Sequence, residues 1–222
     1  MDDLVFLFDV DNTLFDNDAF QRDLGERILE VFGQALHDRY WALFEELRQK
    51  TGYADYIGAL ERLRVENLRD RRLLSLATWL IDYPFPTRLF PGAFDVARHV
   101  AQWGKIVVLS DGDAMFQPIK VDRSGIGATF NGDVLIYIHK QKELDDVERH
   151  YPARRYVLFD DKLQILTDVK TAWKDRVTTV FPRQGHYAKD SKIVDALPPA
   201  DIDIERIGEA IALGRTAFDP KT

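Results

Sequence analysis

Residues 4–14 read Leu-Val-Phe-Leu-Phe-Asp-Val-Asp-Asn-Thr-Leu, and this stretch decides how the rest of the chain is interpreted. The apolar residues 4–8 form an unbroken run, which predicts a short strand buried on both faces, as in a parallel sheet. The polar stretch from Asp9 to Thr13 then ends the strand in a turn. Open parallel sheets bind ligands outside the carboxyl ends of their strands, so this turn is the first candidate for a functional site.

A helical pattern without strands fills residues 18–83. Apolar residues recur at helical spacing in four sets, with a break expected near His37 and a helix end expected at Gly52. Pro84 and Pro86 close the segment, because proline cannot continue a helix. The four sets are Phe20, Leu24, Ile28, Val31 and Ala35; Trp41, Phe44 and Leu47; Tyr56, Leu60 and Leu63; and Leu73, Leu76, Ala77 and Leu80.

Strands and helices alternate in the remainder of the chain, which predicts an α/β fold: a doubly wound parallel sheet with helices on both faces. The expected strands are 105–109, 134–138, 155–159 and 176–181, and the expected helices are 93–103, 143–151, 163–173 and a last one near 203–213 that ends at Gly214. We therefore expect a core of residues 1–15 and 89–222 that carries an inserted all-helical unit, residues 16–88. The predicted hinges lie near Phe15–Asn17 and Pro84–Leu89.

The composition excludes several classes of protein. Of the 222 residues, 45% are apolar and 30% are charged, which argues against a disordered, collagen-like or coiled-coil chain. The chain has no cysteine, so it has no disulfide scaffold and no thiolate metal site. A net charge of −7 argues against a general surface for nucleic acid or anionic membrane. No apolar run approaches the about 18 residues of a membrane span, and the acidic opening Met1-Asp2-Asp3 lacks the basic start of a secretory signal, so we expect a cytoplasmic protein.

Four of the predicted strands end in residues that can carry chemistry. They are Asp9 and Asp11 after the first, Ser110 and Asp111 after the second, Lys140 or Lys142 after the third, and Asp160 and Asp161 after the fourth. Since the carboxyl ends of parallel strands share one edge of the sheet, we expect these residues to form one site.

This set of side chains suits phosphoryl chemistry. Carboxylates without cysteine favour a hard, oxygen-loving cation, and Mg²⁺ takes one or two carboxylates together with water and phosphate oxygens. A lysine and a serine would bind the oxygens of a phosphoryl group. One aspartate can act as the nucleophile, and a second, two residues on, can act as acid for the leaving group and then as base for water.

The same residues carry a resemblance to a known family. Residues 9–13, Asp-Val-Asp-Asn-Thr, resemble the DxDxT signature of the haloacid dehalogenase-like (HAD) hydrolases. Ser110 is similar to their second motif, Lys140 or Lys142 to their third, and Asp160-Asp161 to the paired-acid form of their fourth. The resemblance spans residues 4 to 181 in the family's order. DxDxT alone occurs by chance, whereas four ordered motifs at four strand ends are specific.

The resemblance implies a role for each motif residue. Asp9 would be the nucleophile and a metal ligand, and Asp11 the general acid and base, with its backbone carbonyl on the metal. Asp160 would ligate Mg²⁺ directly or through water with Asp161 in support, and Thr13 would orient the first loop. The substrate phosphate would be bound by Ser110, Asp111 and Lys140.

The helical unit of residues 16–88 falls between the first and second motifs, where the family inserts its helical cap. Residues 89–92, Leu-Phe-Pro-Gly, are also similar to the run that opens the returning core helix in this family. The resemblance therefore implies a cap that closes over the site, excludes water and selects the leaving group.

Some assignments stay open in the sequence. Lys140 directly follows its strand and is favoured over Lys142, which would lie in the first turn of the next helix. Gln164 stands where some members keep a later acid, which gives Asp161 more weight. For His139 we expect a role in packing or as a polar neighbour rather than as a catalytic base. For the loop of residues 183–186 we expect either a solvated loop or a contact with substrate.

The resemblance and the chemistry together predict a Mg²⁺-dependent phosphatase that hydrolyses a small phosphomonoester through an aspartyl phosphate on Asp9. A 2-haloacid dehalogenase or a phosphomutase of the same fold is an alternative, and a HAD-fold binding or regulatory protein is the non-enzyme alternative. Asp11 argues against the dehalogenase, which does not need a second aspartate. The expected partner is a small phosphorylated metabolite, bound by a monomer or a homodimer.

Overall fold

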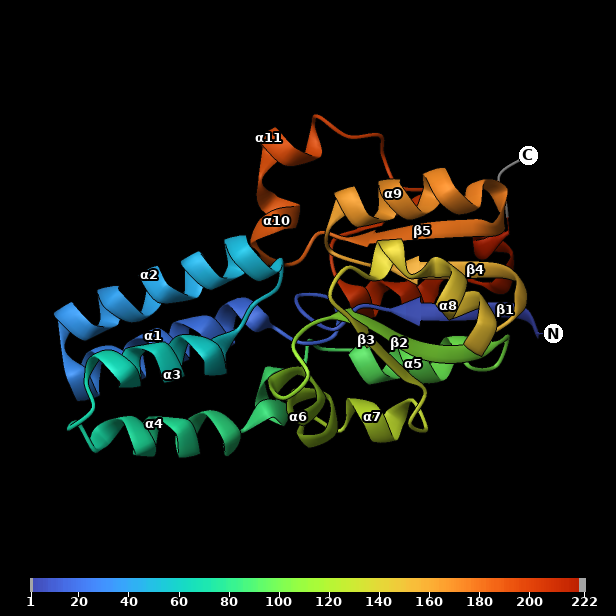
Figure 1. Ribbon diagram of the computed structural model, residues 1–222. Coiled ribbons are helices and arrows are strands. Elements are labelled where there is room, and N and C mark those ends of the chain that lie inside the picture. The colour runs from blue at the N-terminus through green and yellow to red at the C-terminus, as the bar shows by residue number, and fades with distance from the viewer. Residues whose placement is uncertain (1, 220–222) are drawn as a thin grey trace.

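The computed structural model describes residues 2–219, which form a six-stranded, all-parallel sheet with helices on both faces (Figure 1). The strands are β1 (Asp2–Phe8), β2 (Lys105–Asp111), β3 (Val134–Tyr137), β4 (Ala153–Phe159), β5 (Val177–Pro182) and β6 (Ile202–Ile204). They lie in the order β3-β2-β1-β4-β5-β6, so β1 is central and the order reverses around it. This arrangement confirms the predicted doubly wound fold and places the residues after β1 at the switch point, where such sheets bind ligands.

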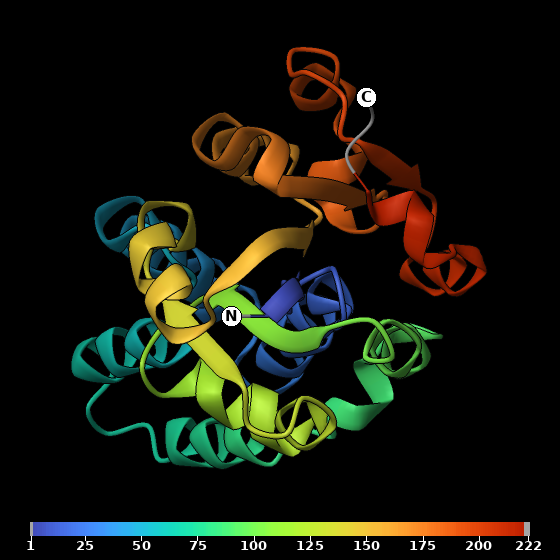
Figure 2. The ribbon, with the colours of Figure 1, turned by 90° about the vertical axis from the view of Figure 1, so that its right-hand side faces the viewer.

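The apolar run of β1 supplies both layers of the core. Leu4, Phe6 and Phe8 pack into one layer, beneath α5 (Ala93–Val100). Val5 and Leu7 pack into the other, beneath α8 (Leu144–His150) and α9 (Leu163–Trp173). Neighbouring residues of a strand point to opposite faces, so an unbroken apolar run is what a strand covered on both sides requires. The view along the sheet shows these two layers of helix (Figure 2).

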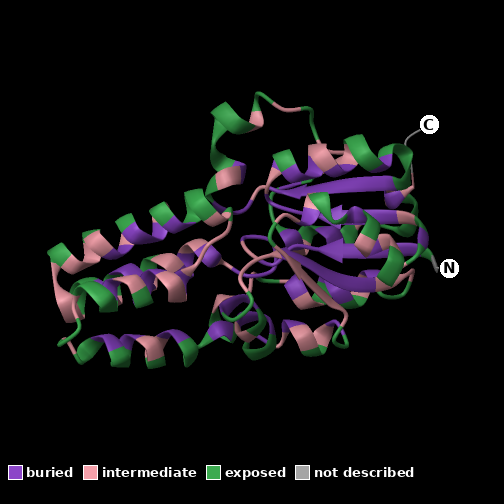
Figure 3. Cartoon of the chain, in the orientation of Figure 1, coloured by how far each residue is buried: buried purple, intermediate pink, exposed green. Residues whose placement is uncertain are grey.

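Four helices form a unit beside the carboxyl-terminal edge of the sheet (Figure 1). They are α1 (Asn17–Phe32), α2 (Gln34–Thr51), α3 (Tyr56–Glu66) and α4 (Arg72–Ile81). Their buried residues face one another, and their outer faces are exposed (Figure 3). Within the described part of the chain, no strand separates β1 from β2 in sequence, as the helical pattern of the segment predicts. The two segments that connect this unit to the core run side by side, with an Asp16 N to Arg88 O hydrogen bond of 2.7 Å.

The predicted helix break near His37 is wrong, because the first helix ends at Phe32 and the interruption lies at Gly33. Gly33 has φ +80°, a left-handed conformation that glycine adopts without a steric penalty, and its backbone N–H donates to the Leu29 carbonyl. Ala35 therefore belongs to the second helix, although its spacing continues that of the first. The predicted end of the second helix at Gly52 is confirmed.

The predicted helix near 203–213 is also wrong. Ile202 and Ile204 lie in the edge strand β6, which pairs with β5, and a 3₁₀ segment follows at Ile207–Ala212. The other predicted strands and helices end within a few residues of their predicted limits. The sequence pattern gave no sign of four short helices: α6 (Phe116–Arg123), α7 (Ile126–Thr129), α10 (Gly185–Lys189) and α11 (Ser191–Val194). Among the described residues, no helix combines the length and the apolar character needed to span a bilayer.

Candidate active site

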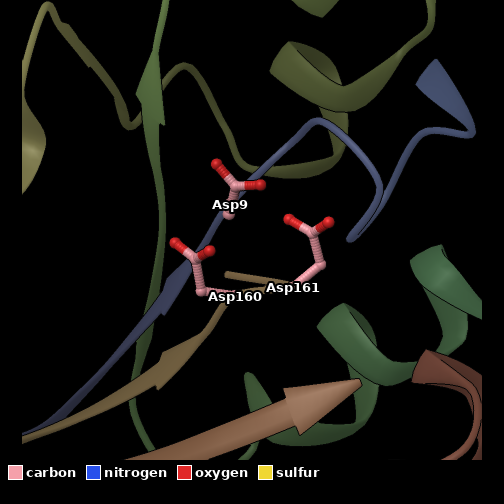
Figure 4. A group of neighbouring side chains, drawn as sticks. All are labelled: Asp9, Asp160 and Asp161. Carbon is pink, nitrogen blue, oxygen red and sulfur yellow. The ribbon is translucent and has the colours of Figure 1, made fainter. Parts of the chain in front are cut away.

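Three carboxylates converge where β1 and β4 end. Asp9 follows β1, and Asp160 and Asp161 follow the neighbouring strand β4 (Figure 4). Each offers an oxygen that lies within 4.8 Å of an oxygen from the other two, and all three residues are buried. The sheet places them there because β1 and β4 pair in register up to Phe8 and Phe159. The structure thus brings together three of the predicted metal ligands.

Lys140 is the cation of this cluster. It is 1% exposed, and its ammonium group contacts Asp9 Oδ1 and lies 2.6 Å from Asp160 Oδ2. It also donates to the Leu109 carbonyl at 3.2 Å. Burial opposes the charged form of Lys140, but the facing carboxylates of Asp160 and Asp9 outweigh it and hold its pKa above the usual value. Lys142 is exposed, so the geometry separates the two lysines that the sequence left open.

The acids after β4 carry more negative charge than their surroundings neutralise. Both carboxylate oxygens of Asp161 are buried without a hydrogen-bond partner among the described residues. Burial raises the pKa of Asp160 to about 6 in spite of Lys140. Burial, followed by the charges of Asp160 and Asp9, raises the pKa of Asp161 well above its usual range. A buried carboxylate of this kind needs a proton or a cation, because an isolated buried charge is costly.

The balance of charges around the four strand ends leads to the same requirement. Five carboxylates face only three ammonium groups, which leaves two negative charges uncompensated. The carboxylates belong to Asp9, Asp11, Asp111, Asp160 and Asp161, and the ammonium groups to Lys120, Lys140 and Lys162. One divalent cation held by carboxylate oxygens matches this deficit, and an all-oxygen donor set fits a hard ion. The residues present therefore fit a divalent cation at Asp9, Asp160 and Asp161.

We expect the metal-free protein to become less stable between pH about 5 and about 7. Asp160 has an ordinary pKa of 3.8 and a folded-state pKa of about 6, and Asp161 is raised too. Between these values the folded protein binds more protons than the unfolded chain, so the stability present at low pH is lost as pH rises through the folded pKa.

The measurement is Tm in EDTA and in Mg²⁺ at the two ends of this range, pH about 5 and pH about 7. Mg²⁺ should raise Tm more at the higher pH, and Asp161→Asn should weaken the pH dependence seen in EDTA. Two results would contradict the raised pKa values of Asp160 and Asp161. One is a Tm in EDTA that does not fall across this range, and the other is a rise in Tm with Mg²⁺ that is the same at both pH values.

The turn after β1 ties the first loop to the acids after β4. Asn12 adopts φ +61°, which asparagine tolerates better than most residues. The hydroxyl of Thr13 accepts a 3.1 Å hydrogen bond from the backbone N–H of Asp161. Thr13 is therefore placed to orient this loop. The Asp11 side chain lies outside the carboxylate cluster and is instead bound to Lys120, with Asp11 Oδ1 to Lys120 Nζ at 2.5 Å.

The end of β2 supplies a hydroxyl and a further carboxylate. Ser110 is 1% exposed, and its Oγ accepts a 2.9 Å hydrogen bond from Gln117 Nε2 in α6. Asp111 accepts a 2.7 Å hydrogen bond from the backbone N–H of Lys140, which joins the β2 and β3 ends. Because this carboxylate is itself negative, any contact of Asp111 with a phosphate would come from its main chain.

The loop of residues 183–186 connects parts of the core through hydrogen bonds and also borders the site. Gln184 is 5% exposed, donates to the carbonyls of Asn12 and Thr13, and accepts from the Ile207 N–H. Gly185 has φ +69°, and a β-carbon there would lie 2.5 Å from the β-carbon of Asn12, so this approach requires glycine. The expectation of a solvated loop is therefore wrong for Gln184, whose side chain positions the first loop.

A cavity of about 280 Å³ lies between the four-helix unit and the strand ends. Its lining includes Phe44, Arg48 and Tyr53 from the helical unit and Asp11, Lys162 and Tyr187 from the core. Arg48 donates to the Tyr187 hydroxyl at 3.2 Å, and the ring of His139 lies against Gly52. Asp9 is 5% exposed and lies outside this lining. The helical unit thus contacts the core beside the cavity, and Asp9 is almost fully covered in this structure.

Three residues of the site escaped the sequence analysis. Gln117 and Lys120 lie three residues apart on α6, a helix that the pattern did not reveal. Their spacing after Ser110 was the only available signal. Lys162 directly follows the paired acids and lines the cavity, with its ammonium group 5.3 Å from the centre of the Tyr187 ring. Burial opposes its charge, but Asp9 and Asp161 outweigh burial and raise its pKa.

Comparison with known proteins identifies the fold family. No protein-family model and no curated protein matches the chain. The crystal structure of a haloacid dehalogenase-like hydrolase from Burkholderia xenovorans is 54% identical, with a TM-score of 0.90 over 96% of this chain and 99% of that one.

Two more distant structures share the fold. An L-2-haloacid dehalogenase from Xanthobacter autotrophicus is 18% identical, with a TM-score of 0.62 over 94% of this chain and 97% of its own. A HAD hydrolase from Bacillus subtilis, solved bound to magnesium, is 16% identical, with a TM-score of 0.61 over the same shares. The 54% identity runs through nearly the whole of both chains, and with the four ordered motifs it shows that this chain is an enzyme of the haloacid dehalogenase-like hydrolase family.

Proposed function

We propose that this hydrolase is a Mg²⁺-dependent phosphatase that acts on a small phosphomonoester through a covalent aspartyl phosphate on Asp9. The observation that carries the proposal is the buried carboxylate cluster of Asp9, Asp160 and Asp161, in which neither oxygen of Asp161 has a hydrogen-bond partner among the described residues. Attack of a carboxylate on carbon requires no cation, whereas transfer of a charged phosphoryl group benefits from one.

Asp9, Asp160 and Asp161 would hold the ion, with the backbone carbonyl of Asp11 as a further ligand implied by the family resemblance. When bound, Mg²⁺ neutralises negative charge on the carboxylates and on the phosphoryl oxygens. The likeness to the magnesium-bound hydrolase of Bacillus subtilis supports this choice of ion.

The side chains of the site divide the reaction into two displacements. A carboxylate oxygen of Asp9 forms a bond to phosphorus while the bond to the leaving oxygen breaks, and Asp11 gives its proton to that oxygen. Asp11 then takes a proton from water as the water oxygen bonds to phosphorus and the bond to Asp9 breaks, which releases inorganic phosphate. Lys140 contacts Asp9 through Oδ1, and Ser110, whose Oγ accepts a hydrogen bond from Gln117, would bind a phosphoryl oxygen.

Asp11 separates this proposal from a 2-haloacid dehalogenase. Proton transfer to a leaving oxygen requires a second acid, whereas a halide leaves without one. Asp11 lines the cavity and its side chain is 23% exposed, so a leaving group bound in the cavity can contact it. The dehalogenases among the solved structures share the fold with this chain at low identity, and a likeness of this kind shows the fold alone.

We further propose that residues 16–88 act as a cap over this site and open to admit substrate. The contacts of Arg48 with Tyr187 and of Gly52 with His139 close the cavity in this structure. A cavity of about 280 Å³ has a size that suits a small phosphorylated metabolite.

We expect EDTA to abolish phosphate release and Mg²⁺ to restore it. Ca²⁺ should restore it poorly, because its about 6–8 ligands and longer bonds would misplace the nucleophile. The measurement is inorganic phosphate released from a panel of sugar phosphates, phosphoglycolate and nucleoside monophosphates, with and without chelator. Halide released from 2-chloropropionate is measured in parallel.

The parallel halide assay makes the two functions distinguishable. Phosphate release that depends on Mg²⁺, without halide release, supports the proposal. Halide release that persists in EDTA, with no phosphate released from any ester, would replace it with the dehalogenase.

A further inference from the structure

We propose that Lys120, which no motif of the family resemblance includes, is a positioning residue that holds the side chain of Asp11 in place for proton transfer. The proposal rests on the phosphatase function, since it concerns the acid and base of that reaction. Lys120 lies on α6, a helix that is packed between the core and the four-helix unit (Figure 1).

The ammonium group of Lys120 is fully enclosed and has two oxygen partners. The residue is 0% exposed. Its Nζ donates to Asp11 Oδ1 at 2.5 Å and to Asn17 Oδ1 at 3.1 Å. Asn17 is the first residue of α1, and its amide donates to the Tyr56 hydroxyl at 3.1 Å. Lys120 therefore connects the loop after β1 with the first and third helices of the cap.

Aromatic rings form the rest of the enclosure. Four ring centres lie 5.3–6.0 Å from Lys120 Nζ, a distance at which the ring faces attract a cation. They belong to Phe15, Phe20, Tyr56 and Phe116. The rings and the two oxygens fix the ammonium group on several sides, so its position is determined before substrate binds.

This fixed ammonium group determines which oxygen of Asp11 is available. Oδ1 is bound to Lys120, while Oδ2 lies 3.5 Å from Gln117 Nε2, and both Asp11 and Gln117 line the cavity. Proton transfer needs the donor oxygen within hydrogen-bond reach of the leaving oxygen and then of water. By holding one oxygen, Lys120 leaves the other to make that contact. The side chain of a free aspartate would rotate, and the population in the productive geometry would fall.

Lys120→Met is expected to lower kcat at least tenfold with p-nitrophenyl phosphate and Mg²⁺, with KM changed less than about threefold. Methionine matches the length of the side chain and packs well against aromatic rings, but it leaves the carboxylate of Asp11 without its cation, so Tm is expected to fall. The kinetics are therefore measured at a temperature where the variant stays folded. If Lys120 had only a structural role, the variant would have a lower Tm and an unchanged kcat at that temperature.

The matched control is Arg123→Met, on the same helix. Arg123 also joins the core to the cap, with its guanidinium donating to Asp82 Oδ1 at 2.8 Å, but it does not contact Asp11. This variant removes one cation and two core–cap contacts, those with Asp82 and with the Ile81 carbonyl, and kcat should stay within about twofold of wild type because exposed ion pairs contribute little.

A double-mutant cycle with Asp11→Asn tests whether Lys120 acts through Asp11. In the Asp11→Asn background, Lys120→Met should change kcat less than about threefold, because the group that it positions is already disabled. The proposal is overturned if Lys120→Met lowers kcat equally in the wild-type and Asp11→Asn backgrounds, or if it does not lower kcat in the wild-type background. If Lys120→Met does not fold, Lys120→Gln, which keeps a donor without the charge, enters the same cycle.

A crystal structure of the Lys120 variant gives a readout that does not depend on activity. The side chain of Asp11 should rotate away from its wild-type position, and an unmoved Asp11 overturns the proposal. Phosphate release by the wild-type enzyme tests the phosphatase function separately, and its absence would refute that function. The position of Asp11 in the crystal would still decide whether Lys120 positions this side chain.

Discussion

Replacing Asp9 with asparagine is expected to abolish turnover and the burst of p-nitrophenol that precedes it. An amide is a poor nucleophile and a poorer metal ligand than a carboxylate. Asp9 and Asp160 both contact the ammonium group of Lys140, so the substitution also removes one of the two carboxylates that pair with this buried cation. The measurement is stopped-flow release of p-nitrophenol from p-nitrophenyl phosphate in Mg²⁺.

Asp11→Asn is the matched control, since it removes a carboxylate two residues away and leaves the nucleophile intact. Steady-state turnover should fall about 10²–10⁴-fold, the usual contribution of a general acid or base. p-Nitrophenolate leaves without a proton, so the first displacement should still occur and the second should be slow. We expect a burst of about one equivalent followed by a slow steady state. Steady turnover in Asp9→Asn would refute covalent catalysis by this residue.

Lys140→Ala and Lys142→Ala are expected to differ by orders of magnitude. Lys140 is buried against Asp9 and Asp160, where its charge stabilises the acids and, in the proposed reaction, would face the phosphoryl group in a partly dehydrated site. Its loss should lower kcat/KM by at least about 10²–10³-fold, as removal of one preorganised donor does. Lys142 is exposed, and its loss should be nearly neutral. The measurement is kcat/KM for both variants, with Tm to show that each is folded.

Two outcomes would count against this assignment. A nearly neutral Lys140→Ala would mean that no lysine at the end of β3 contributes to the reaction. A large loss in Lys142→Ala would mean that an exposed lysine reaches the site when the cap opens.

The strands could be predicted from the sequence because burial on both faces demands unbroken apolar runs. Residues 4–8 and 106–109 show such runs, and both lie in the sheet. The prediction of secondary structure failed where local geometry overrides the apolar spacing. Gly33 ends the first helix through its positive φ, while the apolar residues stay in phase across it. The segment 202–204 is held as a strand by pairing with β5, an interaction that spacing along the chain does not encode.

The candidate site was predictable as far as it consists of residues that directly follow strands. Asp9, Lys140 and Asp160 meet because the sheet is parallel and its strands end at one edge. Lys120 belongs to a different class of residue. Its place beside Asp11 follows from the packing of a short helix against the cap, which depends on contacts between segments about a hundred residues apart. The same applies to Gln184, whose contact with the first loop joins opposite ends of the sequence.

The most direct test of the central claim is the intact mass of Asp11→Asn, quenched in acid shortly after mixing with p-nitrophenyl phosphate and Mg²⁺. The account predicts that the protein gains the mass of one phosphoryl group, that the group maps to the peptide containing Asp9, and that EDTA prevents the gain. Asp9→Asn, treated in the same way, should show no gain. An unmodified Asp9 peptide in Asp11→Asn during the burst of p-nitrophenol, or a phosphoryl group at another residue, would contradict covalent catalysis by Asp9.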